Sequence, residues 1–327
     1  MVHKRVRNIF GLVFCTVFFE LCSSAETQQT PKVPRIGIVV GIAEPNNPSV
    51  TVFRQALQDL GYFEGKNIRF EYRYTEGDRQ RIPEIVSELV NLKVDLLFST
   101  QAIVISVAKK STRSIPIVMA ITADPVAGGL VDSLARPGGN ITGITSLARR
   151  LTGKRLELLM EMIPKLSRVG ILSSAGFTAV KDYEIAARTL KVPLQILEVQ
   201  GPTPELRKAF QAAIKERVGA MILVSVPGLS GYRKQIVDLA LQNRLPLMSE
   251  SVAAVGVGGL VSYHANKDEL LRRAAIYIDK ILKGAKPADL PVEQATKFEL
   301  VINLKTANEI RLTIPPNVLA RADRVIR

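Results

Sequence analysis

The chain has 327 residues, of which 47% are hydrophobic and 23% are charged, and its formal net charge is +14. This length suits two domains of ordinary size, and the composition is that of a globular protein. The only two cysteines, Cys15 and Cys22, lie close to the N-terminus. The rest of the chain therefore has no disulfide framework, no cysteine nucleophile and no cysteine-based zinc site.

The 44 Lys and Arg residues are scattered over the sequence without a tight basic run. This distribution is typical of solvated helix faces rather than of a surface that binds nucleic acid. We therefore expect no nucleic-acid partner. Beyond the N-terminus no apolar run reaches about 18 residues, so we expect no second membrane span.

The N-terminus has the layout of an export signal. Its basic residues are Lys4, Arg5 and Arg7. An apolar core follows at Ile9–Phe19, and Ser23–Ala25 offers a cleavage site with small residues. We therefore predict a signal peptide at residues 1–25, a linker at 26–34 and a periplasmic mature protein. A lipid-anchored or uncleaved form is the alternative, which we favour less because Cys22 lacks the small residues that should precede it.

The first half of the mature chain alternates strand-like and helix-like segments. Strands are predicted at 35–40, 67–74, 94–98 and 115–120, and helices at 50–60, 82–92 and 101–110. The first strand, Arg35–Val40 (RIGIVV), is apolar on both faces, which is typical of a parallel strand covered by helices. The alternation predicts right-handed βαβ units and a parallel sheet.

The second half repeats this plan. Strands are predicted at 168–172, 194–199, 220–226, 245–248, 256–263 and 298–304, and helices at 153–163, 179–190, 204–216, 232–242 and 268–282, with a short helix from Thr306. The strand Arg168–Leu172 (RVGIL) mirrors the first strand of the chain. The sequence therefore predicts two similar α/β halves.

A turn-rich stretch, Asp124–Thr145, lies between the two halves. It contains Pro137-Gly138 and further glycines, which mark turns rather than the interior of a helix or strand. We interpret it as one strand of a hinge between two lobes. The alternative is a surface loop in one large α/β domain.

The motifs of common enzyme classes are missing from the sequence. Outside the leader the chain has one histidine, His264, and no GxSxG, HExxH or P-loop motif accompanies it. A lone histidine next to an apolar strand is typically structural or exposed. We therefore predict no catalytic residues, no metal site and no cofactor.

A binding cleft is the better prediction, because ligands of open parallel sheets lie beyond the carboxyl ends of the strands. The candidate ligand-binding residues at those ends are Glu44, Asn46, Thr100, Gln101, Thr122, Asp124, Ser174, Phe177, Ser225, Glu250 and Tyr263. Hydroxyls at helix starts, such as that of Thr100, suit an anionic group. Glu250 or Asp124 would suit an ammonium, and aromatic side chains an apolar part. Helix capping explains the Ser and Thr residues equally well, and capping or a structural role in the hinge is the favoured role of Asp124.

Four blocks of the sequence resemble the periplasmic solute-binding proteins of ABC importers, in the branch that includes tryptophan- and tyrosine-binding members. These blocks are 53–78, 115–145, 153–172 and 280–307. The resemblance runs from about Val33 to the C-terminus. It implies a type I periplasmic-binding fold with two lobes, each a parallel sheet flanked by helices, and three crossings. We expect the N-terminal lobe at 35–144 with 266–295, and the C-terminal lobe at 145–265 with 296–327.

The resemblance also bears on the solute. Glu250 matches an acidic position of the amino-acid-binding members. Thr100-Gln101-Ala102 stands where members often have Thr-Pro-Ala, and Val226-Pro227 stands where many have an Asp that would pair with an amino group. The implied solute is a small organic compound such as an amino acid or a relative of one.

The implied function is capture of this solute between two lobes and delivery to an ABC permease and its ATPase by a monomeric protein. Contact with the membrane surface would then run through the permease or an anchor. A sensory module for a membrane receptor is the first alternative, and an enzyme that uses the same cleft is a second. A cytoplasmic regulator is disfavoured because the chain has an export signal and no DNA-binding segment ahead of the first strand.

Overall fold

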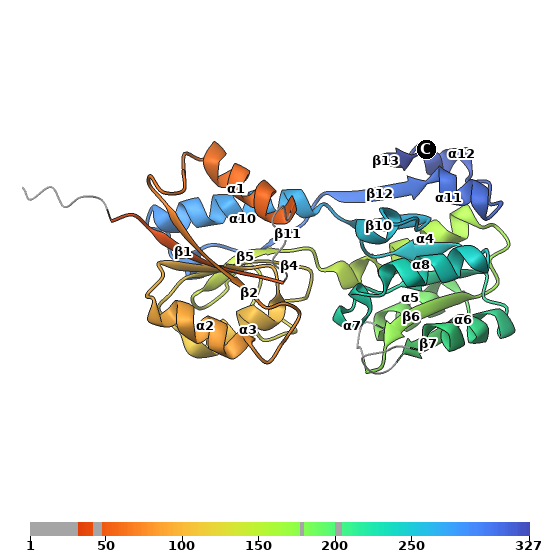
Figure 1. Cartoon of the computed structure of the whole chain (residues 1–327), viewed down its shortest axis with the longest axis horizontal. Helices are drawn as coiled ribbons and strands as arrows, with labels where there is room; N and C mark the ends of the chain where they lie inside the picture. Colours follow the sequence, from red (N-terminus) through yellow and green to blue (C-terminus); the bar gives the residue numbers. More distant parts are fainter. Residues whose placement is uncertain (1–31, 42–47, 177–179, 200–204) are drawn as a thin grey trace, which may run out of the picture. The chain divides into compact units, whose positions relative to one another are not determined.

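The computed structural model describes residues 32–41, 48–176, 180–199 and 205–327 (Figure 1). Pro34–Arg327 form one compact unit, which holds both sheets of the protein. The predicted leader at 1–25 lies outside the described residues, as do Glu44, Asn46 and Phe177. None of the helices described has the length and apolarity to cross a membrane.

The first sheet has six strands in the order β11-β5-β4-β3-β1-β2, and every pairing in it is parallel. Its strands are β1 (Arg35–Val40), β2 (Arg69–Tyr74), β3 (Leu96–Ser99), β4 (Ile117–Ile121), β5 (Ile141–Thr145) and β11 (Glu293–Gln294). Its helices are α1 (Pro48–Asp59), α2 (Ile82–Asn91), α3 (Ala102–Ser111) and α10 (Lys267–Leu282), with a 3₁₀ turn η2 (Pro287–Asp289).

Helices cover both faces of this sheet. On one face α1 and α10 pack against side chains such as Ile36 and Phe98, and on the other α2 and α3 pack against Val39 and Leu97 (Figure 1). Phe53 of α1 stacks on Phe98 with ring centroids 4.3 Å apart. Neighbouring residues of one strand thus enter opposite cores, which explains why these strands are apolar throughout.

The second sheet has seven strands in the order β13-β12-β10-β9-β8-β6-β7. Its strands are β6 (Val169–Ser174), β7 (Leu194–Val199), β8 (Ala220–Leu223), β9 (Leu247–Ser249), β10 (Val261–Ala265), β12 (Phe298–Asn303) and β13 (Arg324–Ile326). All pairings are parallel except that between β10 and β12. Apolar periodicity cannot reveal this antiparallel pairing, because it does not encode strand direction.

Helices also flank the second sheet, where α4 packs against α5 and α6 against α8. They are η1 (Ala148–Leu151), α4 (Thr152–Met162), α5 (Val180–Leu190), α6 (Leu206–Lys215), α7 (Pro227–Ser230), α8 (Arg233–Gln242), α9 (Val252–Val255), α11 (Leu304–Glu309) and α12 (Pro316–Leu319). The predicted strand at 220–226 is shorter in the structure because the chain turns into α7 after Leu223. The predicted strand at 256–263 begins only at Val261, after a glycine-rich turn.

The chain passes between the two sheets three times. The passages follow β5, β10 and β11, since β5 and β11 belong to the first sheet while β6, β10 and β12 belong to the second. These passages give the fold the multiple connections that the resemblance implied.

The interpretation of Asp124–Thr145 as a hinge strand is wrong. This stretch connects β4 to β5, which pair within the first sheet, and the passage to the second sheet begins only at Ser146. Close backbone approach explains the pairing, since Gly143 has φ +134° and a Cβ there would lie 2.1 Å from the carbonyl oxygen of Met119. The glycines therefore serve a tight loop and a close strand pair.

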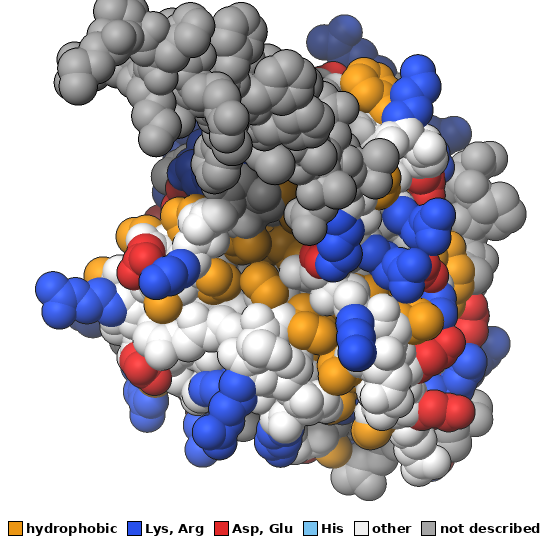
Figure 2. All heavy atoms as spheres, turned by 90° about the vertical axis from the view of Figure 1, so that its left-hand side faces the viewer, with side chains coloured by type: hydrophobic (Ala, Val, Ile, Leu, Met, Phe, Trp, Pro, Cys, Tyr) orange, Lys and Arg blue, Asp and Glu red, His pale blue; other side chains and the backbone are white. Residues whose placement is uncertain are grey.

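On the face drawn in Figure 2, Lys and Arg side chains lie among acidic, apolar and uncharged ones. Their arrangement there follows their scattered positions in the sequence.

Candidate functional site

A cavity of about 690 Å³ is lined by residues that follow strands of both sheets. The residues that come from β3, β4, β5 and α10, or directly follow these strands, include Thr100, Thr122, Asp124, Ser146 and Lys267. Those that come from α4 and β10, or follow β8 and β9, include Arg155, Ser225, Glu250, Ser251 and His264. The carboxyl ends of parallel strands meet at one edge of a sheet, which explains why these residues gather.

Five of the residues predicted from the strand ends line this cavity. They are Thr100, Thr122, Asp124, Ser225 and Glu250. Asp124 has a capping role, but in a turn and not at a helix start, because its Oδ1 accepts hydrogen bonds from the backbone N–H groups of Val126 at 2.9 Å and Ala127 at 3.1 Å. Thr100 is not a cap, since the N-cap of α3 is Gln101 and makes no side-chain capping bond.

Three other predicted residues do not line the cavity. Gln101 is the N-cap residue of α3, and Ser174 is the last residue of β6. The ring of Tyr263 lies 6.1 Å from that of Phe298. Successive side chains of a strand point to opposite faces, so in β10 it is His264, and not Tyr263, that lines the cavity.

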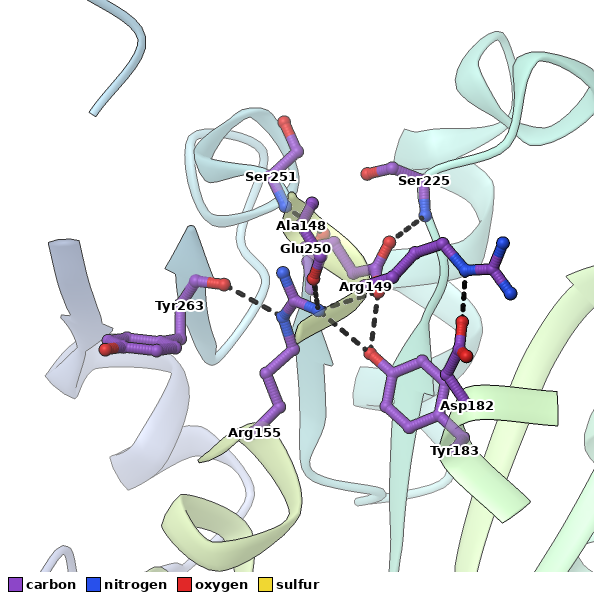
Figure 3. A network of polar contacts seen from close by, with 10 residues as sticks. Ala148, Arg149, Arg155, Asp182, Tyr183, Ser225, Glu250, Ser251 and Tyr263 are labelled. Carbon is purple, nitrogen blue, oxygen red and sulfur yellow. Dashed lines mark hydrogen bonds and ion pairs between the residues drawn. The ribbon is translucent and has the colours of Figure 1, made fainter. Parts of the chain in front are cut away.

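A buried arginine that the sequence analysis did not select lies in the cavity wall (Figure 3). The Arg155 side chain is 0% exposed. Its Nε donates to the carbonyl oxygen of Tyr263 at 2.9 Å, and its Nη1 donates to Oε1 of Glu250 at 2.9 Å. The same Nη1 lies 3.2 Å from the carbonyl oxygen of Ala148 and 3.3 Å from the hydroxyl of Tyr183.

Glu250 is held from three directions. Its Oε1 accepts from Arg155 and, at 2.7 Å, from the hydroxyl of Tyr183. Its Oε2 accepts from the backbone N–H of Ser225 at 3.0 Å. Both carboxylate oxygens thus already have donors within the protein, and the acid positions Arg155 as well as facing the cavity.

The charge states of this network follow from its burial. Burial acts to lower the pKa of Arg155, but Tyr183 and Glu250 outweigh it, so the pKa is raised and the guanidinium stays charged. Burial, with the neighbouring Glu250, raises the pKa of Tyr183 well above its usual range, so the phenol keeps its proton. Burial lowers the pKa of His264, which favours a neutral imidazole.

Three buried polar atoms of the cavity wall have no hydrogen-bond partner within the described part of the chain. They are Ser146 Oγ, Arg155 Nη2 and His264 Nδ1. Buried polar groups of folded proteins nearly always have partners. A polar solute or ordered water would supply them here.

The sequence did contain a signal for Arg155. It lies four residues after Leu151 and four before Leu159, on the buried face of α4. An arginine at such a core position needs a buried partner. His264 was expected to be structural or exposed, whereas it lies in β10 with 11% of its side chain exposed and lines the cavity. In the described residues, no group of three or more His, Cys, Asp or Glu is placed to hold a metal ion.

Comparisons with known proteins agree with this geometry. A family model described as ABC transporter substrate binding protein matches residues 35–326. A tyrosine-binding protein of Clostridioides difficile is 26% identical over 303 residues, which cover 87% of this chain and 83% of that protein.

Solved structures extend the comparison. An ABC domain from Streptococcus pneumonia in complex with L-Trp has a TM-score of 0.79 at 26% identity, over 90% of this chain and 99% of that one. A conserved domain protein of Vibrio cholerae has a TM-score of 0.80 at 25% identity, over 90% of this chain and 100% of that one. These likenesses confirm the predicted two-lobed fold with a mainly parallel sheet in each lobe.

Proposed function

The chain belongs to the ABC transporter substrate-binding protein family, and we propose that it captures a small organic solute outside the cytoplasmic membrane and delivers it to an ABC permease and its ATPase. The observation that carries this proposal is the cavity of about 690 Å³ at the strand ends of both sheets. Concave sites with few, well-placed polar groups are typical of small-molecule binding. Three buried polar atoms without partners in the described residues provide such groups.

The proposal includes export and closure. Residues 1–25 would direct the chain to the periplasm, in keeping with the family's usual place outside the cytoplasm. The two sheets would belong to two lobes, 35–144 with 266–295 and 145–265 with 296–327, that close on the solute. A solute that binds the closed state more tightly shifts the equilibrium toward it.

Binding without turnover is part of the same proposal. Members of this family are substrate-binding proteins rather than enzymes; one relative is named for tyrosine binding, and one solved relative holds L-Trp. An aromatic amino acid or a compound related to one is therefore the first solute class to test.

Solute identification followed by an uptake assay tests this proposal. Small molecules released from the denatured protein, purified from its own host, are identified by mass spectrometry. Cells that lack the gene should then lose uptake of that compound, and the plasmid-borne gene should restore it. Unimpaired uptake in the deletion strain, or conversion of the compound by the purified protein, would contradict delivery to a permease.

A further inference from the structure

Arg155 brings a partly unpaired guanidinium to the cavity wall. Its Nε and Nη1 are engaged by Tyr263, Ala148, Tyr183 and Glu250, whereas Nη2 is buried and has no partner among the described residues. In Figure 3 one guanidinium nitrogen of Arg155 carries no dashed line. An arginine side chain has five N–H donors in a fixed, planar arrangement. The two on Nη2 therefore remain for a solute.

The guanidinium is also fixed in place before any solute arrives. Glu250 and Tyr183 hold Nη1, and the carbonyl oxygen of Tyr263 holds Nε at 2.9 Å. Because the donor is already oriented, a solute loses little additional freedom of the protein on binding. An anionic oxygen is the acceptor that gives such a cation its strongest hydrogen bond.

Glu250 is less free than this cation, and Asp124 is partly engaged. Both oxygens of Glu250 accept hydrogen bonds from the protein, and Oδ1 of Asp124 accepts two from backbone N–H groups. The exposed Lys267 adds a further cation to the lining. Ser146 Oγ, buried and without a partner in the part of the chain described, adds a donor of the kind an anion needs.

From this asymmetry we propose that the solute is an organic acid whose anionic group binds Nη2 of Arg155, and that recognition requires no α-ammonium group. This inference rests on the proposed function and narrows its solute class. The proposed solute differs from the compounds named for two relatives, tyrosine and L-Trp, because both of these are amino acids. Val226, the N-cap of α7, offers no carboxylate to an amino group.

Matched compounds test the inference directly. One set is L-tyrosine, its deaminated acid phloretate and its decarboxylated amine tyramine, and the other is L-leucine, isocaproate and isoamylamine. We expect the acid of at least one set to raise the melting temperature of the purified protein and to bind in calorimetric titration. The amine of that set should do neither, and the amino acid should bind no more tightly than the acid.

Paired substitutions tie the effect to Arg155. Arg155→Gln combined with Glu250→Gln removes both buried charges together, which avoids leaving one of them unpaired. The affinity for the acid should fall by about 10- to 150-fold. Arg168→Gln with Glu216→Gln is the matched control, because it neutralises an exposed ion pair of the second sheet and should leave the affinity unchanged.

Three outcomes would overturn the inference: tighter binding of an amino acid than of its deaminated acid, no stabilisation by either acid, or full acid affinity in the Arg155 double variant. Each leaves the proposed function standing, because solute identification and uptake decide that separately. A released solute that carries an amino group and no acid would be a fourth such outcome, because it would overturn the inference while supporting capture.

Discussion

Residues that follow strands of the first sheet line the cavity with short polar side chains. On the side of the second sheet, the wall contains a buried network of charged side chains. Thr100 and Thr122 stand at the ends of β3 and β4. Arg155 and Glu250, by contrast, are charged and buried. They are joined by a hydrogen bond of 2.9 Å, and their side chains are 0% and 11% exposed. Under the proposed function, Arg155 on the second sheet's side would fix one charged group of the solute, and the hydroxyls on the first sheet's side would contribute shape and hydrogen bonds.

Loss of Arg155 should have the largest effect on stability. Arg155→Ala leaves the carboxylate of Glu250 largely buried without its cation, which costs about 3–5 kcal/mol of unfolding free energy. Urea unfolding of the variant measures this cost. Arg168→Ala, which breaks an exposed pair with Glu216, should cost about 1 kcal/mol or less. Equal losses in the two variants would show that the buried network has no special role.

The next largest effect is expected from Tyr183→Phe. The hydroxyl donates to Glu250 at 2.7 Å, and a hydrogen bond to a charged group contributes about 1.5–3 kcal/mol. Tyr72→Phe is a matched control, because its buried hydroxyl has no hydrogen-bond partner within the described residues. Thermal unfolding of both variants measures the difference. A control variant that is less stable than Tyr183→Phe would show that the hydrogen bond to Glu250 adds no stability.

His264 should make stability depend on pH. Its pKa is lowered in the folded state by burial, so the unfolded chain takes up a proton first as the pH falls below 6.5, the ordinary value for histidine. Stability contributed by the neutral imidazole is therefore present above that pH and lost below it. Denaturant unfolding at several pH values should show a shallower acid loss in His264→Asn. If the unfolding free energies of the native protein and of His264→Asn change with pH in the same way, the imidazole is not buried in solution.

The smallest effect is expected on the first sheet's side. Thr100→Val should change the unfolding free energy by less than about 0.5 kcal/mol, because the hydroxyl caps no helix and surface substitutions of this kind are mild. Its effect on acid affinity should stay below that of the Arg155 double variant. Calorimetric titration of both proteins with the same acid decides the ranking, and a reversed order would place the anion beside Thr100, as the strand-end pattern first suggested.

The fold could be predicted from the sequence because its dominant signal is local. Apolar strands such as Arg35–Val40 alternate with amphipathic helices, and the family model and the solved relatives confirm the resulting architecture. The position of the passage between the sheets could not be predicted in the same way. Whether β5 pairs with β4 depends on the backbone contact at Gly143, which is a tertiary contact and leaves no periodic trace.

The site residues at strand ends were predictable from the sequence, whereas the buried arginine was not predicted. Strand ends correctly directed attention to residues such as Thr100 and Glu250, which line the cavity. Arg155 was overlooked because its partner Glu250 lies 95 residues away in the sequence. The scattered Lys and Arg residues were all interpreted as solvated, and Arg155 was included among them. Only its place between Leu151 and Leu159 pointed to a buried role.

A crystal structure of the protein purified with its native solute tests most directly whether an anionic group of that solute binds Arg155. We expect a solute in the cavity between Thr100 and Glu250, with an anionic oxygen about 2.7–2.9 Å from Nη2 of Arg155. A solute whose ammonium group contacts Glu250 or Asp124 while Nη2 stays without an anionic partner would contradict this expectation. So would a solute bound outside this cavity.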